Sequence, residues 1–104
     1  MKQFVAYLDE KVESYRQESR RLVADDRRDE GNLAKIKANV YGICKSVFQV
    51  QGKEKAQVVL TGLRGEWETS LAAAREHDDV KKAAIEEIKL ETLMEIRAKL
   101  EKEN

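Results

Sequence analysis

The sequence predicts an all-α protein, an up-down-up-down four-helix bundle with helices of about 20 residues. Three observations support this fold class. The 104-residue chain has no proline, where about five would be average, and proline breaks helix interiors. Apolar residues make up 41% of the chain and charged residues 38%, a mixture typical of helices with one buried stripe. Apolar residues also recur at alternating spacings of three and four, the period of one helix face.

The first helix is predicted over residues 2–23. Its apolar seam, interrupted by one serine, consists of Val5, Leu8, Val12, Tyr15, Ser19 and Leu22. A charged connection follows at residues 24–32, where Asp25, Asp26 or Asn32 is expected to cap the second helix. We favour the two earlier caps, because Asp29 and Glu30 then lie in the first helical turn, where the helix dipole stabilises acids.

The second helix carries the most regular apolar seam of the chain, which is expected to face the core. The seam consists of Leu33, Ile36, Val40, Ile43, Val47 and Val50. Cys44 and Phe48 widen the same face. The segment Gln51-Gly52-Lys53 is expected to end this helix, with Gly52 as a left-handed C-cap.

The third helix is predicted over residues 54–75. Its apolar face consists of Ala56, Leu60, Leu63, Trp67, Leu71 and Ala74. Gly62 and Gly65 either let a neighbouring helix approach closely or mark a local kink, and the unbroken phase of the apolar spacing favours close approach. The next connection, residues 76–79, contains no Gly or Pro, and Asp78 is the expected N-cap of the fourth helix. The alternative fold is therefore a three-helix arrangement in which the third and fourth helices are continuous.

The fourth helix, from residue 79 to the C-terminus, has two apolar faces. The first face consists of Ile85, Ile88, Leu93, Ile96 and Leu100, and the opposite stripe of Val80, Ala83, Leu90 and Met94. A helix with two apolar faces needs two partners, so the opposite stripe is either core or a subunit interface. Tyr7 and Tyr41 are further candidate interface residues, because tyrosine is enriched in binding hot spots.

No catalytic, cofactor or metal site is predicted. The chain has one histidine, His77, and one cysteine, Cys44. This is too few for the Glu-x-x-His pairs of a di-iron bundle or for a Cys/His zinc site. Cys44 lies among apolar residues, where a free cysteine packs in the core. We therefore expect a protein that is not an enzyme and has no cofactor.

One charged cluster is the first candidate for a polar functional site. It consists of Arg20, Arg21, Asp25, Asp26, Arg27, Arg28, Asp29 and Glu30. The main interpretation is an ion-pair network that ties the first two helices together. A second is a small-ligand or cation site at Asp25–Glu30. A third is a nucleic-acid-linked regulator that uses the basic group Arg16–Arg28, but 20 basic and 20 acidic residues balance to zero, which argues against nucleic acid as a partner.

The length indicates a single domain over residues 1–104. The N-terminal segment lacks the apolar run of a signal peptide, and no apolar stretch is long enough to span a membrane, so we expect a cytoplasmic protein without membrane contact. The second stripe of the fourth helix, taken with the lack of catalytic groups, predicts a protein that acts by self-association, as a homodimer, or by binding a protein partner.

Overall fold

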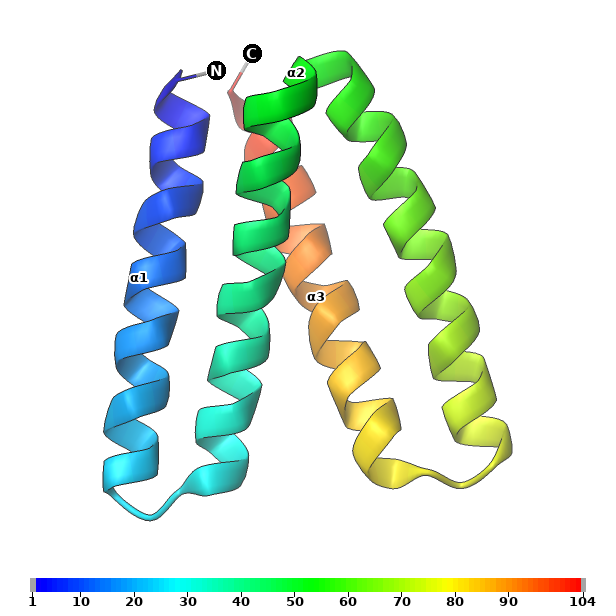
Figure 1. The fold of residues 1–104 in the computed structure, drawn as a ribbon. Helices are drawn as coiled ribbons and strands as arrows, with labels where there is room; N and C mark the ends of the chain where they lie inside the picture. Colours follow the sequence, from blue (N-terminus) through cyan, green and yellow to red (C-terminus); the bar gives the residue numbers. More distant parts are fainter. Residues whose placement is uncertain (1, 104) are drawn as a thin grey trace.

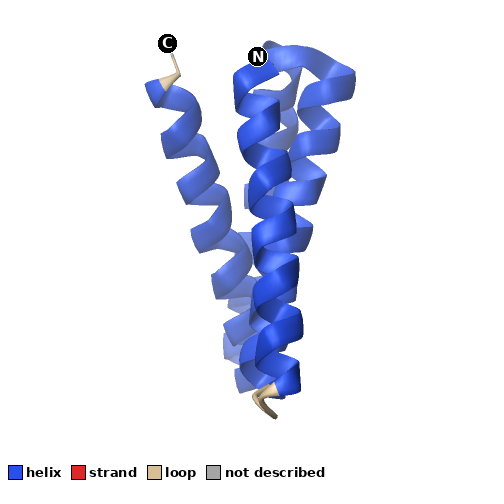
Figure 2. Ribbon diagram, turned by 90° about the vertical axis from the view of Figure 1, so that its left-hand side faces the viewer, coloured by secondary structure: helices blue, strands red, loops and turns tan. Residues whose placement is uncertain are grey.

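The computed structural model describes residues 2–103, which form three helices (Figure 1). The helices are α1 (Lys2–Ala24), α2 (Arg28–Glu76) and α3 (Val80–Lys102). A bend at Gly52 divides α2 into a first arm, residues 28–51, and a second arm, residues 53–76, which run in opposite directions (Figure 1). Both α1 and α3 pack mainly on α2. They meet each other through long side chains, such as Lys99 of α3 over the Tyr7 ring of α1. Figure 2 shows that non-helical backbone is confined to short segments.

The predicted four-helix bundle is wrong, because the described chain forms three helices. The three-helix alternative has the correct number of helices, but a different pair is joined. Helix α2 unites the predicted second and third helices, because the chain reverses at Gly52 without an intervening loop. The predicted third and fourth helices are separate, because residues 77–79 end one helix and begin the next.

The bend depends on the backbone of Gly52, which has φ 78° and ψ 173°. This region of φ/ψ space is essentially restricted to glycine. The predicted positive φ is therefore present, but ψ is far from the left-handed helical value of a C-cap. A Cβ atom at this position would meet no atom within 4 Å, so the requirement for glycine comes from the backbone alone.

The connection between α1 and α2 is a Schellman motif built around Asp26. Asp26 has a φ of 60°, and its N–H donates to the Val23 carbonyl at 3.0 Å. The Arg27 N–H donates to the Leu22 carbonyl at 2.8 Å. These two bonds satisfy carbonyls that a helix end leaves free. The predictions of Asp25, Asp26 or Asn32 as the N-cap of α2 are wrong. Arg27 occupies the N-cap position, and its side chain makes no capping hydrogen bond.

The connection between α2 and α3 repeats this design around Asp78, whose φ is 53°. The Asp79 N–H donates to the Ala74 carbonyl at 2.8 Å, and the Asp79 side chain accepts a bond from the Lys82 N–H at 3.1 Å. The N-cap of α3 is thus Asp79 rather than the predicted Asp78, because Asp78 takes the left-handed conformation that ends α2.

The core lies where α1, α2 and α3 meet. Phe4 of α1 packs edge-on against Phe48 of the first arm, with ring centroids 5.0 Å apart. The second arm contributes Leu60 and Trp67. The buried cluster consists of Phe4, Leu8, Val12, Val40, Tyr41, Cys44, Phe48, Ala56, Leu60, Trp67, Leu93, Ile96 and Leu100.

The glycines of α2 have different surroundings in the two arms. A Cβ on Gly31 would lie 2.7 Å from Val23 Cγ2 and 3.1 Å from the Ser19 carbonyl oxygen. The Ser19 hydroxyl also donates to the Gly31 carbonyl at 2.7 Å, so α1 and the first arm approach closely here. In contrast, Gly62 and Gly65 are exposed and a Cβ on either would meet nothing within 4 Å. The prediction that they admit a neighbouring helix is therefore wrong.

Candidate functional site

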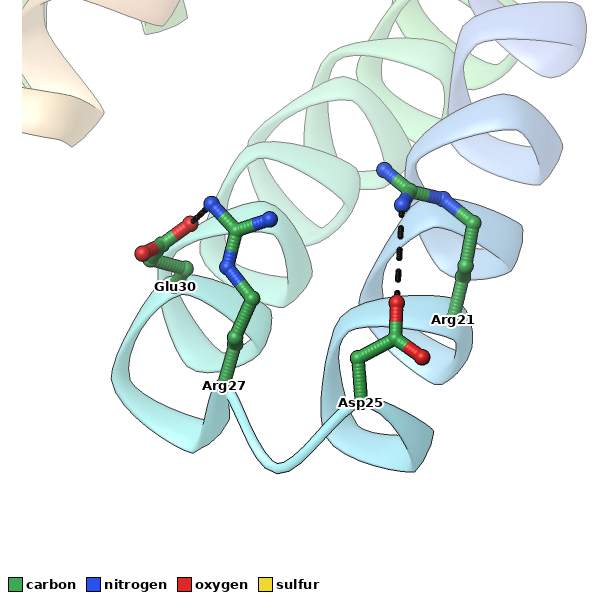
Figure 3. Close-up of polar contacts among 4 residues, drawn as sticks. All are labelled: Arg21, Asp25, Arg27 and Glu30. Atoms are coloured by element: carbon green, nitrogen blue, oxygen red, sulfur yellow. Dashed lines mark hydrogen bonds and ion pairs between the residues drawn. The ribbon is translucent and has the colours of Figure 1, made fainter.

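The charged cluster lies at the turn between α1 and α2, and all eight of its residues are exposed. Figure 3 shows two of its ion pairs, Arg21 with Asp25 at 3.9 Å and Arg27 with Glu30. Arg20 pairs outside the cluster, with Glu13 at 3.6 Å. Exposed pairs of this kind contribute about 0–1 kcal/mol each. Both drawn pairs are local, so they stabilise the ends of their own helices rather than cross-link α1 to α2.

The acids of the cluster do not form a group that could hold a metal ion. Within residues 2–103, no three His, Cys, Asp or Glu side chains lie close enough together to hold a metal ion. The acids Asp25 and Glu30 are already paired with arginines.

The structure divides the candidate interface stripe of α3. Val80 and Met94 are 80% and 66% exposed, whereas Ala83 is half-buried and Leu90 packs against the core cluster. The core role thus fits Ala83 and Leu90, whereas Val80 and Met94 lie on the surface of the chain. The exposed part also carries charge, because Glu87 and Glu91 lie between Val80 and Met94 at helical spacing.

The two candidate tyrosines lie in an aromatic cluster between α1 and the first arm. Tyr41 is 1% exposed, and its ring centroid lies 6.2 Å from that of Tyr7 and 5.7 Å from that of Tyr15. Burial is the main cause that raises the pKa of Tyr41, and a hydrogen bond with Tyr7 adds to it. Burial is also the main cause that raises the pKa of Tyr15, and the nearby Glu95 carboxylate adds to it. Tyr41 therefore has no accessible surface for a partner, whereas Tyr7 is half-buried.

Cys44 lies on the inner face of the first arm and is fully buried. Burial raises the pKa of its thiol to about 12. A thiol with this pKa stays protonated at neutral pH, and the thiolate is the reactive form. The environment of Cys44 is thus that of a core residue rather than of a nucleophile.

A buried carboxylate was not predicted. Glu86 of α3 is 5% exposed, and its Oε1 accepts from Lys89 Nζ at 3.2 Å. Among the described residues, Glu86 Oε2 has no hydrogen-bond partner. Lys89 Nζ also lies 5.4 Å from the centroid of the Trp67 ring, so the lysine links this carboxylate to the second arm.

The sequence also did not predict which face of the first arm is buried. The side that faces α1 and α3 consists of Ala34, Ala38, Tyr41, Cys44 and Phe48. The regular aliphatic seam is only partly covered, because Val40 is buried while Ile43 and Val50 are 41% and 79% exposed. The sequence signal that could have shown this is the second apolar series, in which Ala34, Ala38 and Tyr41 are spaced by four and three.

The outward side of the first arm forms what we call the outer strip. It consists of Asn32, Ile36, Asn39, Ile43, Ser46 and Val50. Spacings of four and three place these residues on one side of the helix. All are exposed except Ile36, which is half-buried, and none is charged. No helix is drawn in front of this arm in Figure 1.

Comparisons with protein-family models, curated proteins and solved structures give no match to this chain. Over the described residues, no helix combines the length and the apolar character needed to span a membrane.

Proposed function

We propose that this protein is not an enzyme and acts by association, with a second copy of itself as the partner. The observation that carries this proposal is an exposed apolar surface in phase with the helices. Ile43 and Val50 lie seven residues apart on the first arm, and Val80 and Met94 lie fourteen apart on α3. Residues at these intervals share one face of a helix, and large apolar groups grouped on one face favour protein contacts.

The alternative roles receive less support from the geometry. Three of the arginines offered for nucleic acid, Arg20, Arg21 and Arg27, are ion-paired with acids, which lowers their capacity to neutralise phosphates. A ligand site at residues 25–30 would have to displace the same pairs. The cytoplasmic location predicted from the sequence remains part of the proposal.

The test is sedimentation velocity on the full chain from low micromolar to near-millimolar concentration. We expect the weight-average sedimentation coefficient to rise with concentration from the monomer value toward that of a dimer. A monomer at every concentration would overturn the proposal. Val80→Glu is a better probe than Leu90→Glu, because Leu90 packs against the core and its replacement would also destabilise the fold.

A further inference from the structure

The outer strip is a ridge between two grooves. Asn39 lines both of them. The groove toward α3 has a volume of about 470 Å³ and includes Ile36 and Val80 in its lining. The groove toward α1 has a volume of about 780 Å³ and includes Ile43 and Val47. Both grooves thus border the same uncharged ridge.

The composition of this face is that of an interface centre with a polar rim. Apolar side chains line the groove toward α3, including Leu33, Ala84 and Ile85, and its charged residues are Asp29, Lys35 and Lys81. The groove toward α1 has Asp9, Arg16 and Lys45 among its lining residues, and Lys45 is paired with Asp9 at 2.6 Å. Interfaces are depleted of charge at the centre and polar at the edge.

A ridge beside a groove is the shape that a two-fold contact requires. In an isologous dimer, one patch must both present side chains and receive them. Helices pack by setting the ridges of one into the grooves of the other. The outer strip and its grooves offer both parts on one face. The strip has no charge, and the chain has a formal net charge of zero, so two copies meet without net repulsion.

The available area is sufficient for a concentration-dependent dimer. The strip is roughly 27 Å long, because a helix rises 1.5 Å per residue. With a groove on each side, the face is about 18 Å wide, or two helix spacings. Two such faces would bury roughly 1,000 Å² in total, the lower bound for a specific interface.

We propose that the outer strip pairs with the outer strip of a second copy, so that one contact covers Ile43, Val50 and Val80. This inference rests on the proposed function, and it assigns the surface and the partner. The exposed face of α3 fits a two-fold contact less well, because Glu87 and Glu91 would be buried with Val80 and Met94.

The experiment compares the self-association of three variants with that of the unchanged chain by sedimentation velocity, after circular dichroism has shown that each variant is folded. Ile43→Lys and Val50→Lys place a charge on the outer strip. Val58→Lys is the matched control, because Val58 is 73% exposed on the second arm and lies outside the strip. We expect the dimer Kd to rise at least tenfold for Ile43→Lys and Val50→Lys and to stay within twofold for Val58→Lys.

The outcomes separate the two proposals. If the unchanged chain dimerises and both strip variants dimerise equally well, the assignment of the outer strip is overturned while self-association stands. An equal loss in Val58→Lys would also overturn it, because the effect would then be one of general surface charge. A chain that is monomeric throughout would overturn self-association and the outer-strip dimer together.

Discussion

The two arms of α2 carry similar apolar repeats in different surroundings. The first arm lies between α1 and α3, its inner face holds Tyr41 and Phe48, and its outer face has no charge at the strip positions. The second arm contributes Leu60 and Trp67 to the core, and its exposed side has the Arg64–Glu68 ion pair at 3.0 Å. This difference shows that a heptad-spaced apolar seam does not by itself identify the buried face of a helix. The face that packs best against the neighbouring helices is buried, and here that face is aromatic and small rather than aliphatic.

The largest effect is expected from the inner face of the first arm. Phe48→Ala removes a ring that is buried against Phe4 and should lower the free energy of unfolding by about 3–5 kcal/mol, measured by urea denaturation. Val50→Ala, two residues away on the outer face, should change it by less than about 0.5 kcal/mol. Equal losses in the two variants would mean that both faces are buried in the isolated chain.

The junction between the arms should be the next most sensitive position. Gly52→Ala places a side chain on a backbone with φ 78° and ψ 173° and should cost about 1–3 kcal/mol. Gly62→Ala, in the helical second arm with open space around it, should stabilise by up to about 1 kcal/mol. Thermal unfolding of both variants measures the two opposite changes in stability. A stable Gly52→Ala protein would show that the bend does not need a positive φ.

A pair of glycines tests how differently the arms are packed. Gly31→Ala should destabilise by about 1–2 kcal/mol, because its methyl group overpacks the contact with Val23 and the Ser19 carbonyl. Gly65→Ala, which meets nothing within 4 Å, should be neutral or slightly stabilising. Chemical denaturation distinguishes them, and the same sign for both variants would contradict the close approach of α1 and the first arm.

The thiol of Cys44 should have the smallest effect on stability at neutral pH, because its contribution changes only at high pH. Because burial raises the pKa of Cys44 from its usual 9.0 to about 12, the folded chain holds a proton there that the unfolded chain loses. Stability is therefore fully present below about pH 9 and falls as pH rises toward 12, by up to about 1.4 kcal/mol per pH unit.

The control for this prediction is Cys44→Ala, which should lose stability less steeply above pH 9. The comparison is needed because the raised pKa values of Tyr15 and Tyr41 act in the same direction. Identical pH slopes in denaturation experiments would show that the thiol does not contribute.

Local sequence signals predicted α1 well. Its range is correct to within one residue, and Leu8, Val12 and Leu22 of its seam are buried. In α3, the predicted face is buried at Leu93, Ile96 and Leu100. Both helices have clear ends, and part of the predicted apolar face of each is buried.

The other features of the fold and of the candidate site depend on contacts between segments that are distant in the sequence. Whether Gly52 ends a helix or bends it depends on where the following segment packs, because a positive φ suits both outcomes. The buried face of the first arm was ambiguous, since apolar residues occupy both of its sides and only the neighbouring helices decide between them. The connection predicted over residues 24–32 is shorter in the structure, because α2 already begins at Arg28. The exposed charges of residues 25–30 give no sequence signal that separates ion pairs from a ligand site.

The start of α1, the end of α3 and the bend at Gly52 all lie at one end of the molecule, opposite the two aspartate turns (Figure 1). A linker attached at either terminus therefore leaves from the end that is remote from both turns. The same arrangement makes the chain a candidate for circular permutation. A linker could join the present ends while new ends open at Asp26 or Asp78, and each long helix segment would remain whole.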